Sequence, residues 1–192
     1  MTPAVLLRET AARFRAAGVP DPETDASLLL SFLIGQPPLA LRLDTETALS
    51  DTVLESYAAL AARREAREPL QYITGEAPFC GHLFFVDPRV LIPRPETEEL
   101  CAWALERMPV SGPCRVLDLC CGSGCIGITL AAARPAWEIT LSDCSSYDTQ
   151  IFPTLCHTLL SLPFPNRKQT HTRFLNIIYS PLTFAFLAKF LP

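Results

Sequence analysis

Lysine is scarce in this sequence, and basic charge does not dominate it. Only two lysines occur among 192 residues, and the formal net charge is −4. Because phosphate binding calls for clustered Lys and Arg, this balance argues against a broad nucleic-acid-binding surface. We therefore expect no direct nucleic-acid partner. The length suits one large domain or two small ones.

A long uninterrupted apolar run is also missing. The N-terminus, MTPAVLLRETAARFRAAG, acquires charge within eight residues. It has no apolar core followed by a small-residue cleavage site, so no signal peptide is predicted. The last apolar run, residues 174–188, contains Asn176 and Pro181 and is too short and too interrupted to predict a membrane span. We expect a cytoplasmic protein with no membrane partner.

Paired cysteine motifs are absent, although the chain holds eight cysteines. Zinc sites usually draw on C-x-x-C pairs, and no such pair occurs. Without a signal peptide, reduced thiols are a better expectation than a disulfide framework. The cluster at Cys114, Cys120, Cys121 and Cys125 is interpreted as small residues lining a tight turn. We therefore expect no metal site.

The composition changes abruptly near residue 144. Residues 1–143 hold 12 Arg, no Lys, all eight Gly and 19 of the 20 acidic residues, which gives a charge of −7. Residues 144–192 hold no Gly, one acid and five prolines, and carry a charge of +3. They also lack a sustained period of 2 or 3.6. We predict an aberrant, irregular tail at 144–192, arising from a frameshift, a truncated gene or an alternative coding end.

The first 67 residues predict a small helical bundle. Apolar spacing and Gly18 predict a helix over about residues 3–17. A second helix begins near Asp21 or Thr24 and stops at Gly35. Ser50 or Asp51 caps a third helix, which ends in the charge run RREAR at 63–67, interpreted as a solvated helix end.

Residues 68–100 predict a β-hairpin linker. Short β-rich pieces surround Gly75 and Gly81. Pro93 and Pro95 then fix an extended turn that enters a helix at Thr97. The charged residues of this turn, Arg94, Glu96 and Glu98, are either a polar wall of an active site or a rigid linker with a favourably charged helix start.

The stretch RVLDLCCGSGCIGITL begins an α/β unit. We expect a buried strand at 115–119, a tight turn at 120–124, a helix at 125–133 and a second strand at 137–141 that ends in Ser142 and Asp143. This order is how mononucleotide-binding folds begin. The turn exposes backbone N–H groups at a helix N-terminus, and the acid is placed to accept hydrogen bonds from ribose hydroxyls.

Two cofactors suit such a turn. Residues 122–127, GSGCIG, match G-x-G-x-x-G with Asp143 about 20 residues onward, as a nicotinamide dinucleotide requires. Asp118, however, stands four residues before Gly122. A carboxylate there faces a pyrophosphate unfavourably but suits the cationic amino-acid end of S-adenosyl-L-methionine. The pattern therefore favours a methyltransferase, with an NAD-dependent oxidoreductase as the alternative.

The string PLQYITGEAPFCGHLFFVDPRVLIPRPETEEL, followed by VLDLCCGSGCIGITLA, resembles the protein-(glutamine-N5) methyltransferases. This family uses S-adenosyl-L-methionine to methylate the glutamine of the GGQ loop in peptide chain release factors. The resemblance covers residues 1–143, about three quarters of the chain. It implies a substrate-docking domain at 1–67, a hairpin linker at 68–100, and at 101–143 part of a Rossmann-like class I methyltransferase domain. We expect this domain to be truncated or frameshifted after residue 143.

The resemblance also implies the cofactor site. Its loop around the methionine part of the cofactor comprises Cys120, Cys121, Gly122, Ser123 and Gly124, and Asp143 binds the ribose hydroxyls. Cys120 stands where many methyltransferases carry a glycine, and its small side chain keeps the turn feasible. For Asp118, a cofactor contact and a strand end tied to neighbouring backbone both remain open.

No catalytic residue is predicted. The family presents the substrate amide with an Asn-Pro-Pro-Tyr motif, and the asparagines here, Asn166 and Asn176, are not followed by Pro. The predicted strands before residue 144 are also too few to complete the sheet, leaving edges unpaired. We expect a weak cofactor binder without methyltransferase activity. A non-catalytic release-factor-binding fragment is the alternative function.

Overall fold

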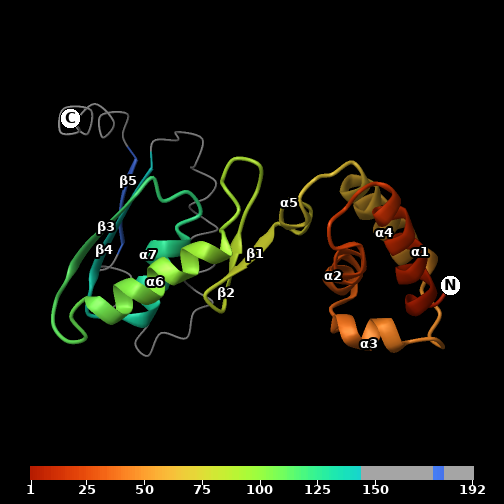
Figure 1. The fold of residues 1–192 in the computed structure, drawn as a ribbon, viewed down its shortest axis with the longest axis horizontal. Helices are drawn as coiled ribbons and strands as arrows, with labels where there is room; N and C mark the ends of the chain where they lie inside the picture. Colours follow the sequence, from red (N-terminus) through yellow and green to blue (C-terminus); the bar gives the residue numbers. More distant parts are fainter. Residues whose placement is uncertain (144–174, 180–192) are drawn as a thin grey trace. The chain divides into compact units, whose positions relative to one another are not determined.

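The computed structural model describes residues 1–143 and the backbone of residues 175–179 (Figure 1). The chain divides into two compact units, one comprising Met1–Gly75 and the other beginning at Glu76. The helical unit thus extends beyond residue 67, because residues 70–74 form a helix and Ile73 joins the helical core.

The first unit consists of helices only. The three predicted helices are confirmed, and two short helices that were not predicted accompany them. The five are α1 (Pro3–Ala16), α2 (Pro22–Ile34), α3 (Pro38–Leu43), α4 (Asp51–Glu65) and α5 (Leu70–Thr74). Pro38 occupies the first position of α3, where the missing N–H costs no helical hydrogen bond.

Local signals set the ends of these helices as predicted. Gly18 and Gly35 follow α1 and α2 in the left-handed region, with φ of 74° and 68°. The Ser50 side chain accepts a hydrogen bond from the N–H of Val53 at 3.4 Å and so caps α4. Asp21 is the N-cap residue of α2, but its side chain makes no capping hydrogen bond.

The core of this unit lies between α1, α2 and α4, with α3 and α5 closing it. Its largest fully buried side chains are Phe14, Leu29, Leu30, Leu41 and Tyr57. The buried Tyr57 hydroxyl donates to the carbonyl of Ala26 at 3.0 Å, as burial of a polar group requires.

The charge run at 63–67 is not wholly solvated, and the prediction was wrong for Arg64. Arg64 is only 9% exposed. Its side chain donates a hydrogen bond of 2.7 Å to Oδ2 of Asp25, a residue of α2. It also donates to the carbonyl of Glu68 at 2.9 Å. The helical period places Arg64 on the inner face of α4, whereas Arg63 stays exposed.

The second unit opens with the predicted hairpin, which is confirmed. Strands β1 (Glu76–Phe79) and β2 (His82–Phe85) pair antiparallel, with Phe79 opposite His82. The two-residue turn takes positive φ at both positions, 47° at Cys80 and 77° at Gly81. Helix α6 (Pro95–Arg107) follows and begins two residues before the predicted Thr97.

The predicted strand–turn–helix–strand unit is also confirmed, but the expectation that its first strand is buried was wrong, because only Asp118 of residues 115–119 is buried. Strand β3 (Arg115–Leu119), helix α7 (Cys125–Ala133) and strand β4 (Glu138–Asp143) follow one another, and β3 and β4 are parallel. Helix α7 packs on the strands and beside α6 (Figure 1). Asp118 is 9% exposed, whereas the adjacent Leu117, on the other face of the sheet, is 60% exposed.

A third strand corrects one expectation. Strand β5 (Leu175–Tyr179) pairs parallel with β4, which therefore lies in the middle of the order β3-β4-β5. The tail was predicted to be irregular, and this was wrong for these five residues. Their sequence, LNIIY, is rich in β-branched and aromatic residues, which favour strands. The other tail residues, 144–174 and 180–192, lie outside the described residues.

Candidate functional site

The predicted cofactor loop lies where β3, α7 and β4 meet. Parallel strands end at the same edge of a sheet, and Leu119 of β3 is in register with Ser142 of β4. The Cys121 N–H donates to the carbonyl of Ser142 at 3.0 Å, so the turn lies against the end of β4. The structure thus brings the turn 120–124 and Asp143 together.

The backbone of the turn explains its small residues. Gly122 and Gly124 have φ of 52° and 73°, which glycine adopts without steric cost. Cys120 also has a positive φ, 58°, although it is not a glycine. Its side chain is exposed, whereas those of Cys121 and Ser123 are buried. The turn therefore requires an unusual conformation at the position where glycine is the expected residue.

Asp143 contacts the turn directly. Its Oδ2 accepts a hydrogen bond from the N–H of Gly122 at 2.8 Å. The side chain at the end of β4 thereby fixes the turn at the first glycine of the GSGCIG string. This contact was not predicted, because the sequence shows the distance along the chain but not the direction of the carboxylate.

Asp118 is tied to the backbone of α7. Its Oδ2 accepts a hydrogen bond from the N–H of Gly127 at 2.8 Å. This N–H belongs to the first turn of α7 and has no partner within the helix. Of the two alternatives left open for Asp118, the structure shows the strand end tied to neighbouring backbone.

The two carboxylates influence each other. Burial raises the pKa of Asp118 above its ordinary value, the Gly127 N–H partly offsets that rise, and the charge of Asp143 adds to it. Negative charge is therefore concentrated at this edge of the sheet. A pyrophosphate is disfavoured here, whereas a cation and neutral hydroxyl groups are suited. The residues present fit S-adenosyl-L-methionine, which carries a sulfonium, an ammonium and ribose hydroxyls.

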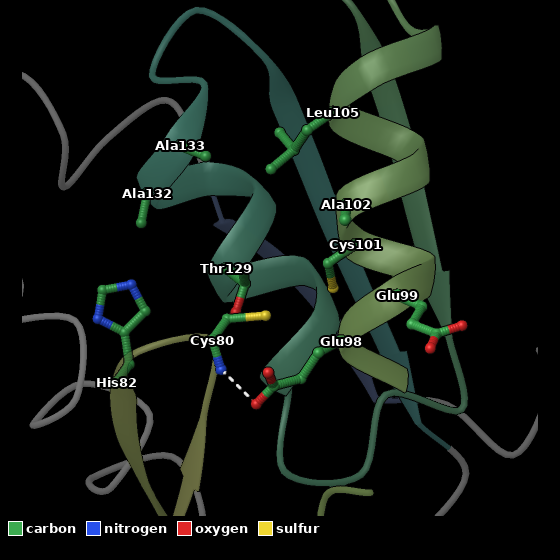
Figure 2. A pocket seen from close by; sticks show the side chains of 10 residues that line it. All are labelled: Cys80, His82, Glu98, Glu99, Cys101, Ala102, Leu105, Thr129, Ala132 and Ala133. Atoms are coloured by element: carbon green, nitrogen blue, oxygen red, sulfur yellow. Dashed lines mark hydrogen bonds between the residues drawn. The ribbon is translucent and has the colours of Figure 1, made fainter. Parts of the chain in front are cut away.

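The three charged residues Arg94, Glu96 and Glu98 differ in their surroundings. The Glu98 carboxylate accepts a hydrogen bond from the N–H of Cys80 at 2.8 Å and so ties the hairpin turn to α6 (Figure 2). Arg94 and Glu96 are exposed. For Glu98, the structure favours the linker interpretation over a wall of the active site.

A cavity of about 600 Å³, apart from the turn 120–124, was not predicted. It brings together the hairpin turn, α6 and the second half of α7, which are far apart in the sequence (Figure 2). No local motif marks these residues, because each segment contributes only a few side chains. The cavity is lined by Cys80, His82, Glu98, Glu99, Cys101, Ala102, Leu105, Thr129, Ala132 and Ala133.

Metal ligation and membrane crossing have no counterpart in the part of the chain that the structure describes. Within residues 1–143 and 175–179, no three His, Cys, Asp or Glu residues are grouped so that they could hold a metal ion. Nor does any helix of these residues combine the length and the apolar character needed to cross a bilayer. The six cysteines described are free thiols.

Comparison with known proteins relates this chain to one family. A sequence-family model, the PrmC N-terminal domain, matches residues 5–75, which correspond closely to the helical unit. The chain is 44% identical over 146 residues to a release factor glutamine methyltransferase of Chlorobaculum tepidum. This match covers 73% of the chain and 50% of the relative.

Two further relatives carry the same name. The protein of Leptospira interrogans is 40% identical over 141 residues, covering 73% of this chain and 49% of the relative. That of Escherichia coli is 39% identical over 137 residues, covering 71% and 48%. The chain thus spans about half the length of the relatives it matches. Over the aligned residues, it belongs to the family of the release factor glutamine methyltransferases.

Proposed function

We propose that this chain binds S-adenosyl-L-methionine at the turn 120–124 and Asp143, as the donor-binding part of a release factor N5-glutamine methyltransferase. The observation that carries the proposal is the hydrogen bond between Asp143 and the N–H of Gly122 at the ends of parallel strands. The parallel order β3-β4-β5, with α7 as the connection between β3 and β4, supports a Rossmann-like class I domain.

Each part of the site has a role in this proposal. Asp143 accepts hydrogen bonds from the ribose hydroxyls, and the turn from Cys120 to Gly124 surrounds the methionine part. Asp118 fixes the first turn of α7 and contributes negative charge that attracts the cationic end. When bound, S-adenosyl-L-methionine supplies an electrophilic methyl group on a sulfonium.

The proposed substrate is the glutamine amide of the GGQ loop of a release factor. Its nitrogen is a poor nucleophile because the lone pair is delocalised into the carbonyl. A transferase must therefore hold this nitrogen in line with the methyl group and accept hydrogen bonds from it. Neither asparagine of these 192 residues is followed by proline. We propose that this chain binds the donor but does not transfer the methyl group efficiently.

The alternative is a module that binds a release factor without catalysis. One observation favours it: the helical unit has its own buried core and coincides with the matched N-terminal domain. An NAD-dependent oxidoreductase is disfavoured by the paired carboxylates beside the turn. The cytoplasmic location expected from the N-terminal sequence stays a prediction.

Two assays on the full chain test the proposal. Calorimetric titration measures binding of S-adenosyl-L-methionine, its demethylated product and NAD. We expect the first two to bind and NAD not to bind. In the second assay, methyl transfer from radiolabelled donor to a purified release factor is measured. We expect transfer at least 100-fold slower than by a full-length relative, and transfer at a comparable rate would contradict the non-catalytic part of the proposal.

A further inference from the structure

The cavity beside α6 and α7 contains a pair of thiols held by different elements. Cys80 lies at the hairpin turn and is half-buried, whereas Cys101 lies in α6 and is 1% exposed. Both thiols line the same cavity, and each influences the pKa of the other. Figure 2 shows both sulfur atoms directed into the space between the hairpin and α6.

The backbone keeps Cys80 in this position. Its N–H donates to Glu98 Oε1 at 2.8 Å, and Glu98 precedes Cys101 by three residues on α6. Residues three apart on a helix lie on the same face. The same helix face therefore supplies both the anchor of the hairpin turn and the second thiol.

A buried hydroxyl adjoins the pair. Thr129 of α7 is 6% exposed, and its Oγ1 has no conventional hydrogen-bond partner among the described residues. It lies beside the Cys80 sulfur, where it partly opposes the rise that burial produces in the pKa of that thiol. The cavity thus presents a weak hydrogen-bond donor to Cys80.

We propose that Cys80 and Cys101 are a dithiol modification site, in which a hydroperoxide oxidises Cys80 and Cys101 then closes an intramolecular disulfide. None of these residues belongs to the turn 120–124 or to Asp143, so this inference does not depend on the proposed methyl-donor site. The disulfide joins the hairpin turn to α6 by a covalent bond across the cavity.

The reaction balances in two steps. The Cys80 thiolate attacks a peroxide oxygen, so that an S–O bond forms, the O–O bond breaks, and hydroxide leaves and takes up the thiol proton as water. The Cys101 sulfur then attacks the Cys80 sulfur. An S–S bond forms, the S–O bond breaks, and the oxygen leaves as water with the Cys101 proton. One hydrogen peroxide is reduced to two waters as the two thiols are oxidised.

The order of the two thiols follows from their surroundings. Burial raises the pKa of Cys101 to about 12, and the neighbouring Cys80 adds to that rise. Burial and Glu98 also raise the pKa of Cys80, but the neighbouring Cys101 and Thr129 side chains partly offset that rise. Cys80 is also the more accessible of the two. We therefore attribute selective disulfide formation at Cys80 to the nearby Cys101 thiol, and not to a high intrinsic reactivity of Cys80.

Peptide mapping of the full wild-type chain tests this proposal. The folded chain is treated with hydrogen peroxide, its remaining thiols are alkylated, and it is digested without reduction for mass spectrometry. We expect the linkage between Cys80 and Cys101 to dominate. When the chain is instead oxidised unfolded in guanidinium, the fraction of disulfide linkages that join Cys80 to Cys101 should fall toward roughly one in 28. This is the share of one pair among all pairs of eight cysteines. A different dominant linkage, or an equal yield in guanidinium, would overturn the proposal.

Variants test the order of the steps. In Cys101→Ser we expect oxidation to stop at a Cys80 sulfenic acid, which dimedone traps. No adduct at Cys80 would overturn the assigned order. Cys114→Ser removes a half-buried thiol outside the cavity and is the matched control. We expect it to leave the linkage between Cys80 and Cys101 unchanged, and loss of that linkage would count against the proposal.

Discussion

Asp118 Oδ2 accepts a 2.8 Å hydrogen bond from the N–H of Gly127 and thereby ties the end of β3 to the first turn of α7. The contact requires glycine at position 127. A Cβ there would lie 2.1 Å from Leu141 Cδ2 and 3.0 Å from the Asp118 oxygen itself. The third glycine of the GSGCIG string therefore serves the close approach of helix to sheet.

The change Gly127→Ala tests this approach. At an exposed position inside an ordinary helix, replacing glycine by alanine would raise the free energy of unfolding by up to about 1 kcal/mol. Here we expect it to lower the free energy of unfolding by about 1–3 kcal/mol, because the new methyl group displaces α7 from Leu141. Chemical denaturation of the full chain measures the difference. In the background Leu141→Ala the added cost should shrink, and an undiminished cost would contradict the steric explanation.

Replacing Cys120 by glycine should leave the stability of the chain unchanged or increase it. Its φ of 58° costs a non-glycine residue about 1 kcal/mol, and its exposed side chain contributes little burial. We expect Cys120→Gly to raise the free energy of unfolding by up to about 1 kcal/mol. Cys114→Gly, at a position without positive φ, should lower it. Equal losses from both variants would argue against strain at Cys120.

Breaking the buried ion pair of the helical unit should be costly. Arg64→Ala leaves the Asp25 carboxylate without its 2.7 Å partner, and the side chains are only 11% and 12% exposed. We expect a loss of about 3 kcal/mol in unfolding free energy. The exposed pair of Arg15 and Glu23 is the matched control, and Arg15→Ala should cost less than about 1 kcal/mol. Similar costs in both variants would contradict the burial argument.

Ionisation of Tyr57 should lower the stability of the helical unit at alkaline pH. Burial raises the pKa of this phenol to about 12 from an ordinary value of 10.0. The unfolded chain therefore releases the proton first, and stability falls as pH rises from about 10 to about 12. Tyr57→Phe should lower stability at pH 7 by about 1 kcal/mol, because its hydrogen bond to Ala26 is lost. It should also flatten the dependence between pH 10 and 12, as denaturation at several pH values would show; an unchanged slope would contradict the assignment to Tyr57.

Local signals predicted most of the elements. Gly35 and Ser50 marked helix ends correctly, because caps depend on a few adjacent residues. The stretch 115–133 predicted a strand, a turn and a helix at the observed bounds. The same reasoning missed α3 and α5, whose few residues carry little periodic signal.

Contacts between distant residues could not be predicted. Nothing near Arg64 indicates that its partner lies 39 residues earlier in α2. Glu98 similarly contacts a residue 18 positions away, so its role in anchoring the hairpin stayed undecided. For Asp118, spacing alone left two alternatives, and only the direction of its carboxylate toward Gly127 distinguishes them.

The most direct test of the donor-binding proposal is calorimetric titration of S-adenosyl-L-methionine into the full wild-type chain and two variants of β4. Asp143→Asn changes the proposed ribose acceptor, and Glu138→Gln changes an exposed carboxylate at the other end of the same strand. We expect Asp143→Asn to weaken binding at least tenfold, about 1.4 kcal/mol, and Glu138→Gln to leave it unchanged. Equal binding by Asp143→Asn and the wild type, or binding of NAD in place of S-adenosyl-L-methionine, would contradict the proposal.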